Sequence, residues 1–250
     1  MKTQPLVSVI IPIYNCAQYI EEAINSVLEQ KKVSFEIILI NDGSTDSLYD
    51  ILSKYLTMDN IVYVENKKNI GVALSRNLGV KIARGKYIAY LDADDYWLPL
   101  KLEKQIKVLE SNDIAICYTG RELLNSDGST TGKVIKAKKY IKYKNLLLHN
   151  YIPCSSVMLP INIAKAVPMC RDDLHEDYIN WLKILKTYGV AYGINEPLIK
   201  YRLSMNSKSR DVIKSANMTF GVYRYLGYGH IVSFLLLMSH ILHNLVKFKK

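Results

Sequence analysis

Three carboxylates lie within four positions, at Asp92, Asp94 and Asp95, directly after the mostly apolar run 87–91. Carboxylates this close repel one another, so they rarely stay together without a cation or a proton between them. The oxygen ligands of an Asp-x-Asp turn suit Mg²⁺ or Mn²⁺, which keep coordination positions open for a diphosphate. A solvated acidic turn, or a helix cap made by Asp94 or Asp95, is the structural alternative. The position after an apolar strand favours a metal site.

Two other segments carry side chains that could serve a nucleotide. The segment Asn-Asp-Gly-Ser-Thr-Asp places Asp42 after an apolar run, where its carboxylate could accept a hydrogen bond from a base N–H. Ser44 and Thr45 fit the cap of the next helix, a role that needs no ligand but accounts less well for Asp42. Arg76 lies near the start of a predicted helix and could reach a phosphate or a nucleobase edge. A lone helical arginine is more often a surface residue.

An acidic pair, Glu176 and Asp177, opens another predicted helix. Carboxylates at this place compensate the helix dipole, and that structural role holds whatever else they do. A functional carboxylate would have the same place in the sequence, with Tyr178 and Trp181 nearby as a stacking wall.

Several well-known motifs are absent from the sequence. It has no G-x-G-x-x-G after the first predicted strand, no G-x-x-x-x-G-K-[ST] and no G-x-S-x-G, so neither a dinucleotide fingerprint, a P-loop nor a hydrolase elbow is indicated. The four cysteines form no C-x-x-C pair and predict reduced thiols. The formal charge of +10 favours anionic partners without choosing among nucleic acid, a membrane surface and phosphorylated substrates.

The elements that must position these residues alternate between strand and helix over the first 120 residues. Short apolar runs predict strands at 6–13, 35–41, 61–65, 86–91 and 113–118. Apolar faces predict helices between them, the last two near 72–83 and 98–110. This alternation predicts an α/β fold with a doubly wound, mostly parallel sheet, with Asp42 and Asp92 on the ligand-binding edge.

Beyond residue 120 the alternation is lost. The segment 133–144 carries six lysines among aromatic and aliphatic residues, a pattern that suits nucleic acid but is more typical of a solvated basic face. A short strand at 155–159, a helix from Glu176, a strand within 190–203 and a helical tail from about 211 complete the chain. The early run 6–13 is too short for a secretory signal and lacks a cleavage site.

Taken together and in order, these motifs resemble the family 2 glycosyltransferases of the GT-A fold. The matching segments are 7–15, 40–46, 69–79, 90–95, 175–182 and 201–202. The tail resembles that of small bacterial enzymes that build surface polysaccharides such as O-antigen or capsule. The resemblance implies a Rossmann-like GT-A domain over 1–210, with a nucleotide-sugar half (1–120) and an acceptor half (121–210), followed by a helical C-terminal extension over 211–250.

The resemblance also implies roles for single residues on the donor side. Pro12, Tyr14 and Asp42 would hold the uridine, with Tyr14 stacked on the base. Arg76 would help to fix the nucleotide, and Asp92 would contact the ribose.

On the reaction side, Asp94 would bind the Mn²⁺ or Mg²⁺ ion that bridges the diphosphate. Asp177 would be the general base, with Glu176 as the next candidate. Many relatives carry a histidine within two residues of Tyr201-Arg202, where this chain has Leu203 and Ser204. Lys208 or Arg210 would then supply the positive charge near the diphosphate.

The resemblance implies an inverting, metal-dependent transfer of a hexose from a UDP-sugar to a hydroxyl of a glycan acceptor, such as a sugar on undecaprenyl diphosphate. One base without a covalent nucleophile predicts a single displacement. UDP-glucose and UDP-galactose are favoured only by their frequency among donors, and no nucleic acid is expected as a partner. Two alternatives stay open. A D-x-D phosphatase-like hydrolase would use Asp92 as nucleophile but usually has Thr or Val where this chain has Tyr96, and a non-catalytic sugar-nucleotide binding protein would need no base.

The tail carries an apolar helix without Asp, Glu, Lys or Arg over 231–246, short of the ~20 residues that span a bilayer. One face would hold Ile231, Phe234, Leu235, Met238, Ile241, Leu242 and Leu245, and the other Ser233, His240 and Asn244. Lys247, Lys249 and Lys250 follow. We expect this helix to lie on an anionic membrane surface and to keep a cytoplasmic protein peripheral to the inner face of the cell membrane. A helix packed on the domain, or a homodimer contact, would show the same stripe.

Overall fold

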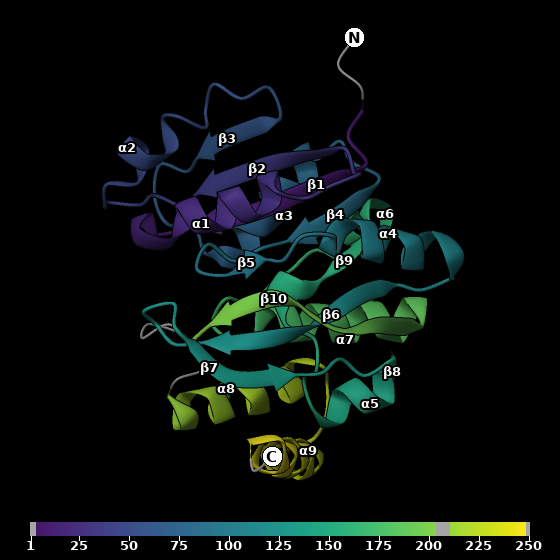
Figure 1. Cartoon of the computed structure of the whole chain (residues 1–250). Coiled ribbons are helices and arrows are strands. Elements are labelled where there is room, and N and C mark those ends of the chain that lie inside the picture. Colours follow the sequence, from purple (N-terminus) through teal and green to yellow (C-terminus); the bar gives the residue numbers. More distant parts are fainter. Residues whose placement is uncertain (1–3, 204–210, 249–250) are drawn as a thin grey trace.

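The structure is a computed structural model that describes residues 4–203 and 211–248 (Figure 1). One mixed sheet runs through the described chain, in the strand order β3-β2-β1-β4-β9-β6-β10-β5, with β7 paired to β6 and β8 to β10. The strands are β1 (Val7–Ile13), β2 (Phe35–Asn41), β3 (Ile61–Glu65), β4 (Tyr87–Tyr90), β5 (Tyr96–Trp97), β6 (Ile116–Leu124), β7 (Thr130–Ile135), β8 (Tyr140–Lys142), β9 (Met158–Pro160) and β10 (Val190–Arg202). This confirms the predicted α/β class and the mostly parallel sheet of its first half.

The first four strands of the chain are mutually parallel, as the alternating pattern predicted. β1 and β2 are buried at nearly every position, because helices cover both faces of the sheet. The register sets Ile13 opposite Asn41 and Ile10 opposite Tyr90. The residues that follow these strands therefore meet at one edge, and Asp42 and Asp92 lie there.

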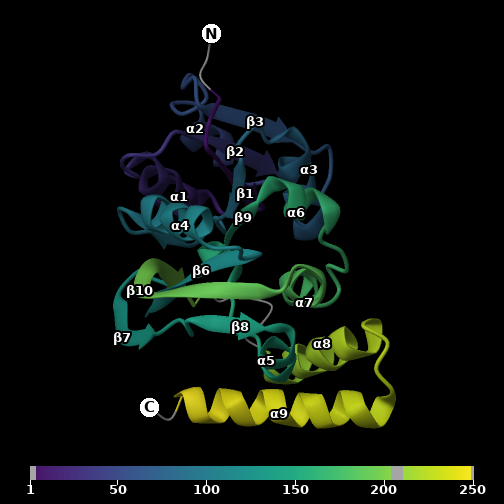
Figure 2. The same ribbon diagram turned by 90° about the vertical axis from the view of Figure 1, so that its right-hand side faces the viewer.

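The helices of this half are α1 (Ala17–Leu28), α2 (Leu48–Leu52), α3 (Val72–Ile82) and α4 (Lys101–Ser111). Figure 2 shows α1 and α4 on one face of the strands and α3 on the other. Helix α3 packs closely on β1, since a Cβ added at Gly79 would lie 2.6 Å from the Ile10 side chain. Close packing of this kind fixes the direction in which α3 presents Arg76.

Helix α4 begins at Lys101, three residues later than the predicted start at 98. The chain before it is extended instead: Tyr96 and Trp97 pair with β10 as the short strand β5, and the Leu98 N–H donates to the Leu198 carbonyl. These backbone groups are taken by the sheet and cannot start a helix. Neither Asp94 nor Asp95 caps α4, whose N-cap residue is Leu100, without a side-chain cap bond.

The second half joins the first through β9, which runs antiparallel to both β4 and β6. The predicted strand at 113–118 lies at 116–124 and pairs in parallel with β10. The lysine-rich segment, expected as a solvated face, contributes β7 and β8 to the sheet. The remaining elements here are α5 (Tyr143–Leu148), a 3₁₀ turn (Cys154–Ser156), α6 (Ile161–Ala166) and α7 (Glu176–Tyr188).

The C-terminal extension is helical, as predicted, and consists of α8 (Val212–Tyr225) and α9 (His230–Phe248). Helix α9 is the outermost layer of the molecule and packs on α8 and α5 (Figures 1 and 2). Within the described ranges, no helix combines the length and the apolar character needed to cross a bilayer.

Candidate functional site

A cavity of ≈ 340 Å³ opens at the carboxyl ends of β1 and β2. Its lining consists of Pro12, Ile13, Tyr14, Asp42, Asn69, Gly71, Val72 and Asp172. Three residues predicted to hold the uridine are therefore brought together here. The Tyr14 side chain is 49% exposed, so its ring is available to stack on a ligand.

Asp42 lines this cavity and is only 3% exposed. Its carboxylate accepts hydrogen bonds from the backbone N–H groups of Ile70 (2.9 Å) and Gly71 (2.8 Å) and from the Asn66 side chain (2.9 Å). Gly71 has a φ of 94°, and a Cβ there would lie 2.3 Å from the Asp172 carboxylate. Asp42 thus builds the pocket wall, and its predicted contact with a base would be a second role.

The residues after Asp42 clamp the neighbouring turn. The Asn15 N–H donates to Ser44 Oγ (3.1 Å), the Thr45 N–H donates to Asn15 Oδ1 (2.8 Å), and the Ala17 N–H donates to Asp46 Oδ2 (2.9 Å). The prediction that Ser44 or Thr45 caps the next helix is therefore wrong. These side chains bond to the 15–17 turn, which begins α1 and follows Tyr14.

Arg76 connects the two acidic segments of the sequence. It is 3% exposed, and its Nη2 lies 2.6 Å from Asp92 Oδ1 while its Nη1 lies 3.0 Å from Glu176 Oε1. Charge-assisted pairs of this kind fix both carboxylates. The predicted contact of Arg76 with a nucleotide stays a prediction, since both terminal nitrogens bind protein carboxylates here.

Asp95 is the structural member of the acidic turn. It is 2% exposed; the Ser155 hydroxyl donates to Asp95 Oδ2 (2.5 Å) and the Arg202 N–H donates to Oδ1 (2.8 Å). Burial, and then the charges of Asp94 and Asp92, raise the pKa of Asp95 well above its usual range. Asp95 therefore holds the turn against β10.

The sequence did not single out Ser155, and it marked Arg202 only as part of a family motif. Ser155 also accepts the Asp92 N–H through its hydroxyl (3.2 Å), and the Arg202 Nε donates to the Asp94 carbonyl (2.9 Å). Both residues shape the acidic turn from distant parts of the chain. No sequence pattern around Ser155 could have predicted this contact.

Asp94, the predicted metal ligand, is half-buried beside Asp92. Among the described residues no group of three or more His, Cys, Asp or Glu side chains is arranged to hold a metal. A Mg²⁺ or Mn²⁺ ion on a diphosphate needs only one or two carboxylates from the protein, because phosphate and water oxygens complete its shell. The carboxylate oxygens of Asp94 and Asp92 are hard ligands and fit such an ion. Lys208 and Arg210, the predicted cationic helpers, lie outside the described residues.

Asp177 lies in the first turn of α7, where its Oδ1 accepts the N–H of Tyr178 (2.7 Å). Burial and the neighbouring Glu176 carboxylate raise the pKa of Asp177 to about 7. A carboxylate with this pKa is suited to general base catalysis near neutral pH. Glu176 is 7% exposed and paired with Arg76, so the geometry favours Asp177 as the base.

The loop before α7 is fastened to the nucleotide half by two residues that sequence reasoning missed. The Asn77 side chain donates to the Met169 carbonyl (2.8 Å) and accepts its N–H (2.9 Å). Asp172 Oδ1 accepts the Ala73 N–H (2.8 Å) at the start of α3. These bonds hold the loop before α7 against α3, and polar residues in a loop gave no signal of them.

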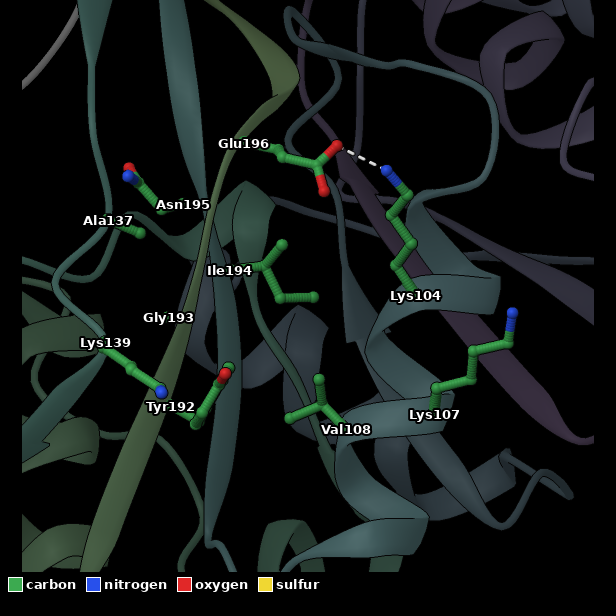
Figure 3. A pocket seen from close by; sticks show the side chains of 10 residues that line it. All are labelled: Lys104, Lys107, Val108, Ala137, Lys139, Tyr192, Gly193, Ile194, Asn195 and Glu196. Atoms are coloured by element: carbon green, nitrogen blue, oxygen red, sulfur yellow. Dashed lines mark hydrogen bonds and ion pairs between the residues drawn. The ribbon is translucent and has the colours of Figure 1, made fainter.

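A larger cavity of ≈ 530 Å³ lies elsewhere, between α4, β10 and the β7–β8 connection. Figure 3 shows Lys104 paired with Glu196 at its rim and Tyr192 and Lys139 on the opposite side. None of the predicted site residues lines it. The smaller cavity is therefore the candidate active site, because the predicted site residues Pro12, Tyr14 and Asp42 line it.

Comparison with known proteins identifies the family of the chain. Residues 8–161 match the family described as Glycosyl transferase family 2. TuaG of Bacillus subtilis (strain 168), which carries a provisional assignment as a teichuronic acid biosynthesis glycosyltransferase, is 39% identical over 224 residues, 88% of each chain. WfaP of Escherichia coli, a UDP-Glc:alpha-D-GlcNAc-diphosphoundecaprenol beta-1,3-glucosyltransferase, is 33% identical over 97% of this chain and 95% of its own.

A solved structure shares the fold. The crystal structure of residues 1–349 of S. aureus TarS in complex with UDP-GlcNAc superposes with a TM-score of 0.71 at 17% identity, covering 92% of this chain and 70% of that one.

Proposed function

The chain belongs to glycosyl transferase family 2, and from this premise we propose that it is an inverting, metal-dependent hexosyltransferase with a UDP-sugar donor. The observation that carries the proposal is the Arg76 bridge. It holds Asp92 at 2.6 Å and Glu176 at 3.0 Å, and so supports a common reaction centre for the acidic turn and the proposed base Asp177.

The donor would lie in the 340 Å³ cavity. Tyr14 would stack on the uracil beside Pro12, and Asp42 would accept its N–H while continuing to hold the Ile70–Gly71 backbone. Asp92 would contact the ribose. Arg76 would fix the nucleotide indirectly, by holding Asp92 in place.

Asp94 would hold Mn²⁺ or Mg²⁺, which when bound supplies positive charge for the departing diphosphate. An acceptor hydroxyl is a poor nucleophile until a carboxylate takes its proton, and Asp177 would be that carboxylate. Glu176 would support it by keeping its charge nearby, since this charge helps to raise the pKa of Asp177. A single displacement by the acceptor inverts the anomeric carbon, so the acceptor would bind opposite the UDP.

The acceptor class rests on the relatives. WfaP acts on a sugar linked to undecaprenyl diphosphate, and we propose an acceptor of the same class for this chain, in the synthesis of O-antigen or another surface polysaccharide. A lipid-linked acceptor requires access to the membrane, and we therefore propose that the enzyme works as a peripheral protein on the inner face of the cell membrane. UDP-glucose is the first donor to test because WfaP uses it; UDP-galactose is the second.

The test is a donor screen with purified protein, Mn²⁺ and a synthetic lipid diphosphate-linked GlcNAc acceptor, with the product's anomeric configuration read by NMR. We expect transfer with inversion and release of UDP. Release of inorganic phosphate from phosphomonoesters would instead support the phosphatase-like alternative. Binding of UDP-sugar without turnover on any acceptor or water would support the non-catalytic one.

A further inference from the structure

Helix α9 turns a side of large apolar residues away from the protein. Ser233 is fully buried against the Tyr228 carbonyl, and His240 packs on Tyr178 and His149, with ring centroids 5.8 and 4.9 Å apart. The residues predicted as the polar face thus contact the body of the molecule. Leu236 and Leu237 also pack against the core, so α9 has apolar side chains on both its inward and its outward side. A surface helix normally leaves a polar side in solvent, and the outward side of α9 does not.

The outward side of α9 carries large apolar side chains that are 40 to 78% exposed. They are Ile231, Val232, Phe234, Leu235, Met238 and Leu242. Their spacing of three and four residues forms one continuous stripe along the helix. Ile241, predicted to belong to the stripe, is half-buried; the side chains from Asn244 onward lie beyond the described part. Contiguous exposed apolar surface of this kind marks a docking site.

The positive charge of the chain is concentrated around this helix. The segments 128–150 and 212–250 contain eleven Lys and Arg residues and no Asp or Glu, whereas the rest of the chain has 22 basic and 23 acidic residues. The net charge of +10 therefore comes entirely from two segments that together form β7, β8, α5, α8 and α9. These elements lie at one end of the molecule (Figure 2).

A chain of side-chain contacts links the lysine-rich strands to α9. Lys138 Nζ lies 3.9 Å from the Tyr151 ring centroid, and Tyr151 contacts His149 edge-on at 4.6 Å. His149 in turn stacks on His243 of α9 at 5.9 Å. These contacts, together with the packing of α9 on α5 and of α5 on β8, place the lysine-rich segment next to α9.

We propose that the outward stripe of α9, together with the lysines of residues 133–144, is a docking face for an anionic lipid bilayer. Amphipathic helices with apolar residues at acyl depth and basic residues at the headgroups bind such surfaces. An apolar partner protein would not require the surrounding excess of positive charge, and a nucleic acid would not require the stripe. The proposal rests on the proposed function only in that a lipid-linked acceptor explains why the enzyme docks there.

The stripe is tested by sedimentation of the full chain with vesicles of phosphatidylethanolamine and phosphatidylglycerol. Leu235→Glu should lower the bound fraction at least about tenfold, because a carboxylate opposes insertion and anionic headgroups. Tyr49→Glu is the matched control: Tyr49 is 66% exposed on α2, against 62% for Leu235, and it should bind like the wild type. Equal binding by both variants would overturn the proposal.

The basic border is tested with the pair Lys142→Glu and Lys144→Glu, matched in charge by Lys31→Glu and Lys81→Glu in the nucleotide half. Only the first pair should lower vesicle binding, again about tenfold at low salt, and the loss should shrink as salt screens the surface. If the wild type bound phosphatidylcholine vesicles as well as vesicles that contain phosphatidylglycerol, the proposal that the bound lipid surface is anionic would fail. The proposal would also fail if Lys142→Glu and Lys144→Glu weakened binding of an RNA duplex but left vesicle binding unchanged.

Two further measurements distinguish a lipid face from a dimer contact and from the donor site. If Leu235→Glu converts a lipid-free dimer into a monomer without affecting vesicle binding, the stripe is a contact between copies and the proposal fails. UDP titration with Mn²⁺ in lipid-free buffer should be unchanged in every variant. Absence of UDP binding in the wild type would refute the proposed function alone, because vesicle binding is measured without a donor.

Discussion

The acidic turn at 92–95 and the acidic pair at 176–177 each contain one carboxylate that we do not propose for chemistry, Asp95 in the turn and Glu176 in the pair. The two regions differ in how the protein stabilises this carboxylate. In the turn, Asp95 is held by a hydroxyl and a backbone N–H, and its pKa rises well above the usual range. In the pair, Glu176 is held by the Arg76 guanidinium at 3.0 Å, and the pKa of its neighbour Asp177 rises to about 7. Neutral donors therefore stabilise Asp95, whereas a cation stabilises Glu176.

This difference decides what each region can do. Neutral donors bring no positive charge to Asp95, whose raised pKa favours its neutral form, while Arg76 pairs with Asp92. Asp94 is the member of the turn that we propose for the metal ion. The guanidinium compensates Glu176 and leaves Asp177 as the group that can take a proton. In each of the two regions, therefore, one carboxylate is held by protein donors and another is the one we propose for chemistry.

The largest effect should come from Asp177→Asn. We expect turnover to fall about 10³-fold or more with donor affinity nearly unchanged, because a general base acts mainly in the transition state. Steady-state kinetics and UDP titration measure the two quantities. Asp173→Asn, four residues earlier and 62% exposed in its side chain, is the control and should keep full turnover. Wild-type-like turnover of Asp177→Asn would move the base to Glu176.

Asp94→Ala should weaken UDP binding in the presence of Mn²⁺ about 100-fold, because the leaving diphosphate loses its cation. Calorimetric titration of UDP with and without Mn²⁺ measures the change, and Asp127→Ala, in an exposed turn, serves as control. The fold should stay intact by circular dichroism. If UDP binding by the variant were unchanged and still dependent on Mn²⁺, Asp94 would not be a metal ligand. The proposed difference between the two acidic regions would then be lost.

The pH dependence of kcat/KM should show an acid limb near pH 7. Below this pH Asp177 is protonated and cannot take the acceptor proton, so the rate falls by about tenfold per pH unit; above it the rate reaches a plateau. In Glu176→Gln the limb should move to lower pH, since the Glu176 charge helps to raise the pKa of Asp177. A limb that does not move would mean that the pair is not coupled as its geometry indicates.

Asp95→Asn should have the smallest effect, below about 1 kcal/mol in the free energy of unfolding. The amide oxygen can still accept the Arg202 N–H, and a residue whose pKa is strongly raised loses little by becoming neutral. Asp95→Ala should cost about 2 kcal/mol, because it leaves buried donors without acceptors. Urea unfolding compares the two, and a severe loss in Asp95→Asn would show that the turn needs this charge.

Much of the nucleotide half was predictable from the sequence, for a physical reason. Strands buried on both faces are continuous apolar runs, and parallel strands bring their carboxyl ends to one edge, which predicts Asp42 and Asp92 as neighbours. Strands without an apolar run, such as β5 and β7, gave no such signal. They form because β10 and β6 offer backbone hydrogen-bonding groups to them. The sequence of the short strand alone does not show that such a partner exists.

Side-chain partners across long sequence distances were not predictable either. The periodicity of α3 placed Arg76 on a helix but could not show that Asp92 and Glu176 receive both ends of its guanidinium. Likewise, the pattern of α9 gave two faces without telling which one points outward. Periodicity reports that a helix has two sides, whereas the direction depends on what the other elements leave uncovered.

The Arg76–Glu176 pair joins residues 100 positions apart, and this separation has a consequence for the order in which the protein is made. Domains are synthesised and fold from the N-terminus, and contacts of long sequence separation form late. When the strands of the nucleotide half have left the ribosome, the acidic turn and the pocket exist only in part, because Ser155, Asp172 and α7 have not yet been translated. The nascent chain becomes an enzyme only in the last third of its synthesis.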